Sequence, residues 1–251
     1  MRKKIVAGNW KMNKSWSEAT ELSKSLSSGA SAFPEDVQVI ISPPSLYLLG
    51  LQKELPTNIA LSAQNCSEHE AGAFTGEISA SMLNSIGVNH CIIGHSERRQ
   101  FFGETDEVIR MKIDACLRNL ITPIFCCGEL LSERKANKHF TTVSGQLQQA
   151  LFHLSSDQLA QVVIAYEPVW AIGTGVTATI QEAEDMHAFI RGFIAEHYVE
   201  SVANGIPILY GGSVNASNAT ELFACPNVDG GLVGGASMKA ADFTTIILAA
   251  K

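Results

Sequence analysis

The sequence predicts an α/β protein in which eight parallel strands form a barrel inside eight helices, a (β/α)8 barrel. Short apolar runs recur eight times along the 251 residues. They are rich in Val and Ile and continuously apolar, as are parallel strands that are covered on both faces. The mean unit of 251/8, about 31 residues, matches a βα unit. Because there is no linker or low-complexity segment, we expect one domain over residues 1–251.

The eight apolar runs are the expected strands, in chain order. The alternative, an open doubly wound sheet, is disfavoured because no GxGxxG motif follows the first run. The expected strands cover residues 4–9, 37–42, 59–64, 91–95, 122–127, 161–167, 206–211 and 228–234.

Helices are expected between the strands. One over 15–27 opens with Ser and Glu, which is typical of a capping sequence. In a second, over 105–119, we expect Val108, Met111 and Ala115 to share a face, and in a third, over 179–197, Ala183, Met186 and 189–190 do likewise. A last helix closes the chain at 241–250.

The composition narrows the possible partners and the compartment. The formal net charge of −7, without a basic run, disfavours nucleic acid. No apolar run has the length to span a membrane, and the segment after MRKK is too short and polar for a signal peptide. The six cysteines include no CxxC pair, so neither a disulfide framework nor a zinc or other metal site is expected. We therefore predict a reduced, cytoplasmic protein.

Polar side chains follow several expected strands directly. Asn9 and Lys11 come after the first strand, His95 and Glu97 after the fourth, and Glu167 after the sixth. Each alone has an ordinary structural explanation, such as a surface cation, a buried histidine or a helix cap. In a parallel barrel, however, the carboxyl ends of all strands meet at one rim, where active sites form. Their joint position therefore predicts an active site.

Glycine pairs follow the last two expected strands. Gly211, Gly212 and Ser213 come after the seventh strand, and Gly234 and Gly235 after the eighth. Glycine lets backbone N–H groups approach a ligand closely, and the start of a following helix adds positive potential. Two such turns side by side predict a phosphate site built from backbone, which suits a chain of negative net charge.

Several motifs together resemble the triosephosphate isomerase family. They are NWKMN, AGAFTGEIS, IIGHSERR, CCGE, AYEPVWAIGTG, YGGSVN and LVGGAS, between Lys4 and about Met238. The resemblance implies a TIM barrel that interconverts dihydroxyacetone phosphate and D-glyceraldehyde 3-phosphate without a cofactor, in glycolysis and gluconeogenesis. It also implies a homodimer.

The resemblance assigns roles to the residues at the rim. Glu167 would be the base, and a neutral His95 would donate a hydrogen bond to the substrate oxygens. Lys11 and Asn9 would stabilise the enediolate, and Lys11 would pair with Glu97. The phosphate would contact backbone at Gly173, Ser213, Gly234 and Gly235.

Further residues are expected to support this machinery. Ser96 would hold Glu167 while the site is open, Cys126 would support the strand of the base, and Glu129 would steady Trp170. We also expect two structural pairs, Arg98 with Glu104 and Arg191 with Asp229.

The apolar segment after Glu167 is interpreted as a lid. An enediol phosphate readily loses phosphate in water, and an apolar cover suppresses that side reaction. The alternative is a contact loop for a partner protein. The lid residues would be Pro168, Val169, Trp170, Ala171, Ile172, Gly173, Thr174 and Gly175.

The polar loop 65–79 is long for a compact barrel. The resemblance implies that Phe74 and Thr75 at its tip insert into a second subunit, near Lys11 of the partner subunit. The alternative is an exposed surface loop.

Some positions depart from the family pattern, among them Val176, where relatives commonly carry Lys. Two other functions stay open: a different phosphate-binding barrel enzyme, such as an amino-sugar isomerase, and a non-enzymatic dimeric binding protein. Neither needs Lys11, His95 and Glu167 together, so their joint presence favours the isomerase.

Overall fold

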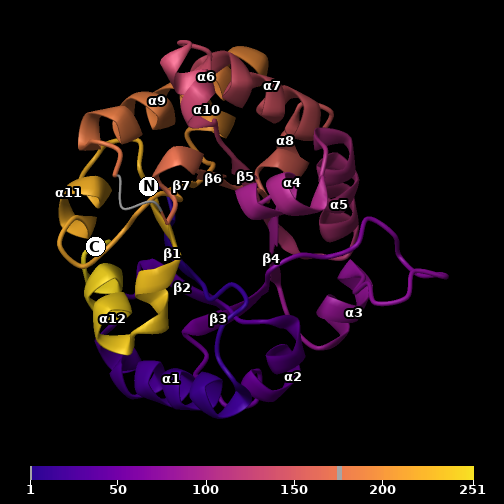
Figure 1. The fold of residues 1–251 in the computed structure, drawn as a ribbon, viewed down its shortest axis with the longest axis vertical. Helices are drawn as coiled ribbons and strands as arrows, with labels where there is room; N and C mark the ends of the chain where they lie inside the picture. Colours follow the sequence, from indigo (N-terminus) through magenta and orange to yellow (C-terminus); the bar gives the residue numbers. More distant parts are fainter. Residues whose placement is uncertain (1, 174–176) are drawn as a thin grey trace.

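Eight parallel strands close into a barrel in the computed structural model, which describes residues 2–173 and 177–251. The strands pair in chain order, and β8 returns to β1, so that no strand edge is left open (Figure 1). The predicted fold class is confirmed. The strands are β1 Lys4–Asn9, β2 Val37–Ser42, β3 Ile59–Ala63, β4 His90–Ile93, β5 Thr122–Cys127, β6 Val163–Tyr166, β7 Ile208–Tyr210 and β8 Gly230–Val233.

Helices surround the barrel, and several of the connections hold two or three α-helices where the sequence predicted one (Figure 1). None of those in the described residues is long and apolar enough to cross a bilayer. The helices are α1 Trp16–Gly29, α2 Leu48–Leu51, α3 Ala80–Ser85, α4 Ser96–Phe102, α5 Asp106–Arg118, α6 Leu131–Lys135, α7 His139–Leu151, α8 Ser156–Leu159, α9 Ile180–His197, α10 Glu200–Ala203, α11 Ala219–Phe223 and α12 Ala240–Leu248.

The longest helices begin where the sequence supplies a capping residue. Ser15 Oγ accepts a hydrogen bond from Glu18 N, and the Glu18 carboxylate accepts one from Ser15 N, which completes a capping box before α1. Thr179 and Glu182 repeat this arrangement before α9. Such caps satisfy N–H groups that the helix itself leaves unpaired, and they fix where each helix leaves its loop.

Of the three residues expected to share a face of α5, Ala115 is buried and Val108 is half-buried, but Met111 is exposed. Met111 is 40% exposed, whereas Ile109, Lys112 and Cys116 are buried. The buried face of α5 follows Ile109, Lys112, Ile113 and Cys116, one position along the chain from the expected stripe. The face predicted for α9 is correct at Ala183, Met186 and Ile190.

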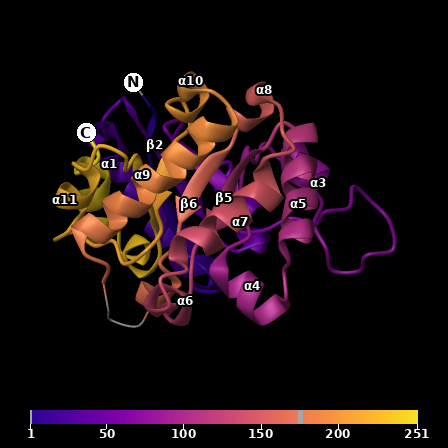
Figure 2. The same ribbon diagram turned by 90° about the horizontal axis from the view of Figure 1, so that it is seen from above.

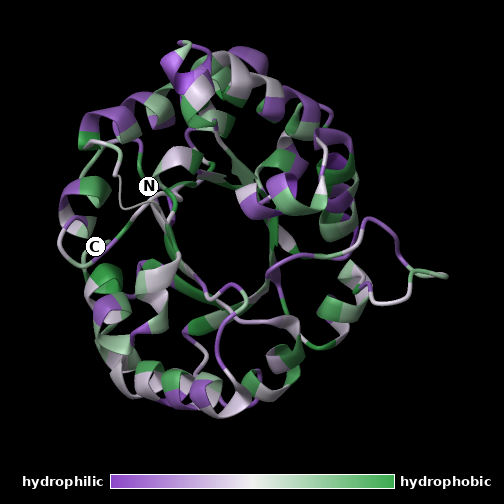
Figure 3. Ribbon diagram, in the orientation of Figure 1, coloured by the Kyte–Doolittle hydropathy of each residue, from purple (hydrophilic) through white to green (hydrophobic). Residues whose placement is uncertain are grey.

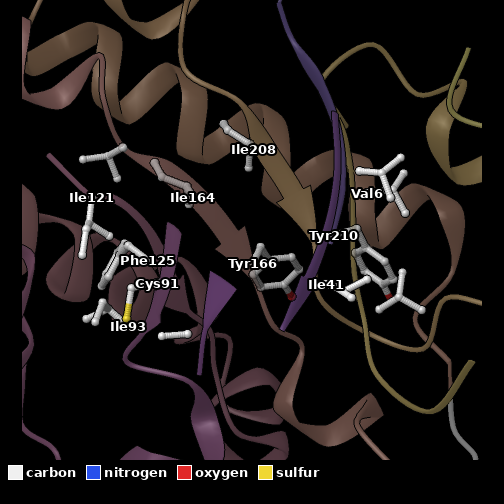
Figure 4. Close-up of a cluster of buried hydrophobic side chains, with 14 of the residues drawn as sticks. Val6, Ile41, Cys91, Ile93, Ile121, Phe125, Ile164, Tyr166, Ile208 and Tyr210 are labelled. Carbon is white, nitrogen blue, oxygen red and sulfur yellow. The ribbon is translucent and has the colours of Figure 1, made fainter. Parts of the chain in front are cut away.

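Apolar side chains fill two layers. Inside the barrel lie Ile5, Ala7, Ile40 and other inward-facing residues, and a larger layer lies between strands and helices, part of which Figure 4 shows. Figure 3 shows hydrophobic colour along the strands and hydrophilic patches over the helices. Burying one Ile or Val side chain contributes roughly 1.5–3 kcal/mol, so both layers hold the strand ends firmly in place.

The two ends of the barrel differ. Figure 2 shows α4 and α6, which follow β4 and β5, at one end, and α8 and α10 at the other. The segment between β3 and α3 projects away from the barrel in both views (Figures 1 and 2). The end that carries α4 and α6 is therefore the rim where the strands finish.

Candidate active site

A cavity of about 440 Å³ opens where the strands end. Its walls come from the ends of β1, β4, β6, β7 and β8. The residues predicted to act on the substrate or to contact its phosphate all line it: Asn9, Lys11, His95, Glu167, Gly173, Ser213, Gly234 and Gly235. The fold thus brings together every member of that set.

Glu167 lies one residue beyond β6 and is 2% exposed. Its carboxylate has two donors: Ser96 N lies 2.8 Å from Oε2, and His95 Nε2 lies 3.0 Å from Oε1. The expected contact with Ser96 is present, and it is made by the backbone N–H. Each oxygen of this buried carboxylate therefore has one hydrogen-bond donor.

His95 caps α4, and this position fixes its tautomer. Glu97 N donates a 3.2 Å hydrogen bond to His95 Nδ1. Nδ1 must then be unprotonated, so that a neutral ring carries its proton on Nε2. The Nε2–H consequently points at Glu167 and the cavity.

Lys11 has a positive φ of 54°, which is uncommon for a residue with a side chain. Lys11 N donates to Asn9 Oδ1 at 3.0 Å, and Gln64 Nε2 donates to Lys11 O at 2.9 Å. The ammonium lies 2.5 Å from Glu97 Oε1, as expected. Gln64 was not predicted, because its role depends on a contact between two strand ends that no local motif signals.

Two glycines also make room for Glu167, the expected base. A Cβ on Gly211 would lie 2.9 Å from Glu167 Cγ, and one on Gly212 would lie 2.3 Å from the Tyr210 hydroxyl and 2.9 Å from Pro168 Cγ. Side chains at both positions would therefore displace the base or the residue after it. The sequence predicted these glycines only as a phosphate turn.

The start of the segment that is expected to form a lid is tied to the barrel through a buried carboxylate. Trp170 Nε1 donates to Glu129 Oε1 at 2.8 Å, and the Tyr166 hydroxyl donates to the same oxygen at 3.1 Å. Arg134 pairs with it at 3.2 Å and lies over the Trp170 ring. The expected support of Trp170 by Glu129 is thus present. Gly173 has a φ of 69°. Thr174, Gly175 and Val176 lie outside the described residues.

Cys126 is fully buried in β5, next to the strand of the base. Burial, with a smaller effect of the Glu167 charge, raises its pKa well above the usual thiol value. Cys126 is therefore a neutral thiol that fills space beside β6.

The two expected structural pairs are present. Arg98 Nε lies 2.6 Å from Glu104 Oε1, and Arg191 Nη2 lies 2.7 Å from Asp229 Oδ2. Lys112, 3% exposed, also contacts Glu104, at 2.5 Å.

Phe74 and Thr75, at the tip of the loop 65–79, do not line the cavity of this chain. Phe74 is 43% exposed and stacks on the His69 ring, with centroids 3.8 Å apart. This arrangement presents apolar surface away from the barrel.

Comparison with known proteins agrees with this geometry. A family model described as triosephosphate isomerase matches residues 4–250. A triosephosphate isomerase of Cytophaga hutchinsonii is 50% identical over 98% of both chains. That of Porphyromonas gingivalis is 50% identical over 98% of this chain and 99% of its own, and that of Bacteroides fragilis is 49% identical over 98% of both. The chain therefore belongs to the triosephosphate isomerase family, and its activity is the isomerisation of triose phosphates.

Proposed function

We propose that this chain interconverts dihydroxyacetone phosphate and D-glyceraldehyde 3-phosphate through an enediolate, with Glu167 as the base. The observation that carries the proposal is the meeting of the Glu167 carboxylate and His95 Nε2, 3.0 Å apart, in the cavity that Lys11 also lines. One carboxylate can remove a proton from one carbon and return it to the neighbouring carbon, since both lie within its reach.

The donors on Glu167 define what must happen when substrate binds. Ser96 N and His95 Nε2 stabilise the carboxylate while the site is empty of substrate. Substrate takes their place, and His95 Nε2–H is then free to donate to the substrate oxygen. Exclusion of water and loss of donors both favour proton transfer to a carboxylate.

The enediolate needs compensation for the negative charge on its oxygens. The neutral His95 supplies a donor, Lys11 supplies a positive charge, and Asn9, whose Oδ1 accepts from Lys11 N, lies beside both. Donors that are already in place for the developing charge stabilise a transition state without reorganisation.

The phosphate is assigned to the glycine-rich side of the cavity. Gly173, Ser213, Gly234 and Gly235 line that side, and the position of a Cβ on Gly235 would face open space. Backbone N–H groups can therefore reach an anion there. The lid that begins at Pro168 would close over the bound phosphate and protect the intermediate from water.

A coupled assay with D-glyceraldehyde 3-phosphate tests the assignment. Glu167→Gln keeps the size of the side chain and removes the base, so the rate should fall by about 10²–10⁴-fold. Retained turnover in this variant would contradict the proposal. Turnover of an amino-sugar phosphate but not of the triose would favour a different barrel enzyme, and the absence of any turnover would favour a binding protein.

We also propose that the chain is a single-domain, cytoplasmic homodimer, assembled through the loop 65–79. The support is the projecting loop with Phe74 near its tip, together with large exposed apolar side chains on neighbouring segments. Monomeric proteins rarely expose large apolar patches. These side chains include Met12, Leu46, Phe101 and Phe102.

Sedimentation tests the dimer. The wild-type chain should sediment with twice the mass of one chain at micromolar concentration. Phe74→Asp should shift the distribution toward the monomer, because a charge would be buried in the interface. A wild-type chain that sediments as a monomer would refute the assembly.

A further inference from the structure

Three cysteine sulfurs meet outside the active site. Cys66 follows β3, Cys91 lies in β4 and Cys116 lies in α5, and the three sulfur atoms are all within 4.8 Å of one another. Each residue is at most 1% exposed. The proposed reaction uses none of them, and their spacing in the sequence predicted no metal site. The fold alone brings them together.

The distances between the three sulfur atoms suit the binding of one metal ion. Cys66 Sγ and Cys116 Sγ are 3.5 Å apart, which is too far for a disulfide bond. A metal–thiolate bond is about 2.3 Å long, so three sulfurs around one ion in a trigonal plane lie about 4 Å apart. The observed spacing is close to this value, and binding would require only small side-chain movements.

The ligand set selects the type of ion. It contains three sulfurs and no histidine or carboxylate, and soft thiolate ligands favour monovalent copper. Zinc prefers four ligands. Cys91 lies in the apolar layer with Ile93 and Phe125 (Figure 4), which offer no fourth protein ligand. We propose that Cys66, Cys91 and Cys116 bind one Cu(I) ion through their three sulfurs.

The surroundings help to compensate the charge of the thiolates. Each sulfur that binds the ion loses its S–H proton to solvent, and the resulting negative charge needs a partner. The buried ammonium of Lys112, which lies on the same helix as Cys116 and donates to the side chain of Asn65, the neighbour of Cys66 in the chain, places a positive charge close to the cluster. Lys112 is itself held by Asn65 and Glu104.

A route from the surface ends at Cys66. A cavity of about 350 Å³ is lined by Cys66, Asn65, Glu77, Ile78 and Arg98, among others. These residues belong to the segment after β3 and to α4. An ion can therefore reach the first sulfur without opening the barrel.

Competition with a chromophoric Cu(I) chelator under anaerobic conditions tests the site. The wild-type chain should withdraw one Cu(I) per chain from the chelator, and X-ray absorption should show three sulfur neighbours at about 2.3 Å. Cys91→Ala and Cys116→Ala should each weaken retention by at least tenfold. Cys225→Ala is the matched control, because Cys225 lies apart from the cluster and is partly exposed, and it should retain one ion.

Isomerase activity without copper shows whether the alanine variants are folded, since neither Cys91 nor Cys116 lines the active site. If a variant loses activity, it is not informative about binding. The test then rests on the wild-type chain, which should bind one Cu(I) ion with three sulfur neighbours. Failure of the wild-type chain to compete, equal retention by the active Cys91→Ala and Cys116→Ala variants, or loss of the ion in Cys225→Ala would each overturn the proposal.

Discussion

The position of the Glu167 side chain is fixed at both ends. Its backbone N–H donates to Cys127 O at 2.7 Å, and its carboxylate lies between His95 and Ser96. A base in such a position acts through geometry as much as through chemical type. A displacement of about 1 Å can cost on the order of 10²-fold in rate.

Glu167→Asp tests this geometry, because it keeps the carboxylate and withdraws it by one methylene. We expect kcat to fall about 10²-fold, with a small change in KM, because the phosphate contacts are untouched. Steady-state kinetics measure both constants. A variant with nearly wild-type kcat would show that the position of the carboxylate is not critical.

Two buried histidines make stability depend on pH. Burial lowers the pKa of His90 and of His187 from 6.5 to about 4. Between pH 6.5 and about 4 the unfolded chain binds more protons than the folded chain. The contribution of these two histidines to the free energy of unfolding is therefore complete above pH 6.5 and is lost as the pH falls towards 4. The slope approaches about 1.4 kcal/mol per pH unit for each histidine.

Urea unfolding at pH 7.5, 6.0 and 5.0 measures this dependence in a range where carboxylates contribute little. His187→Gln should reduce the slope, because it removes one of the two titrating groups. A free energy of unfolding that is constant over this range would refute the explanation.

The residues of the site were predictable from sequence where a motif carries them. Lys11, His95 and Glu167 stand in short patterns at the ends of apolar runs, so their convergence followed from the barrel. Gln64 and the positive φ of Lys11 were not predictable, because both depend on contacts between separate strand ends.

At the scale of elements, the periodic pattern of the sequence predicted helix and strand positions better than their faces. The strands were found because continuous apolar runs are typical of a parallel sheet. In α5, however, Lys112 is buried against Glu104 and Asn65, and a pattern of apolar residues could not include it.

The lid is an element whose role can be tested by its products. Removal of residues 171–174 should leave the barrel intact, because β6 ends at Tyr166 and β7 begins only at Ile208, so that no strand is shortened. The exposed intermediate should then lose phosphate, so inorganic phosphate and methylglyoxal should appear beside the isomer. Product analysis by NMR distinguishes the outcomes, and clean isomerisation would eliminate the lid role.

At the scale of the whole molecule, a buried ion pair helps to lock the closing strand. Arg191 of α9 contacts Asp229, and Asp229 also accepts from Ile208 N at the start of β7. Arg191→Ala should destabilise the chain by about 1–3 kcal/mol, because it removes a donor from the buried Ala203 and Ile206 carbonyl oxygens and one of two cations from Asp229, on which Arg2 remains.

Thermal and urea unfolding measure this loss. Arg118→Ala is the matched control, since its pair with Glu70 is exposed on both sides, and exposed pairs contribute little. Equal melting temperatures for Arg191→Ala and wild type would contradict a structural role for the pair.

The barrel was predictable from sequence because the strand–helix unit recurs eight times. Eight parallel strands that alternate with helices have few arrangements in which both faces of the sheet are covered. The cysteine cluster was not, because Cys66, Cys91 and Cys116 come from three different elements and share no spacing rule. Contacts between elements are therefore the part of the molecule that required the structure.

The central claim is that Glu167 transfers the proton within a cavity that holds one phosphorylated triose. A crystal structure with 2-phosphoglycolate, whose carboxylate mimics the enediolate, tests it most directly. We predict that the Glu167 carboxylate leaves Ser96 N and contacts the ligand, that His95 Nε2 donates to the ligand, and that the phosphate lies against Ser213 and Gly235. A ligand bound elsewhere, or a Glu167 carboxylate still on Ser96 N and out of contact with the ligand, would contradict the account.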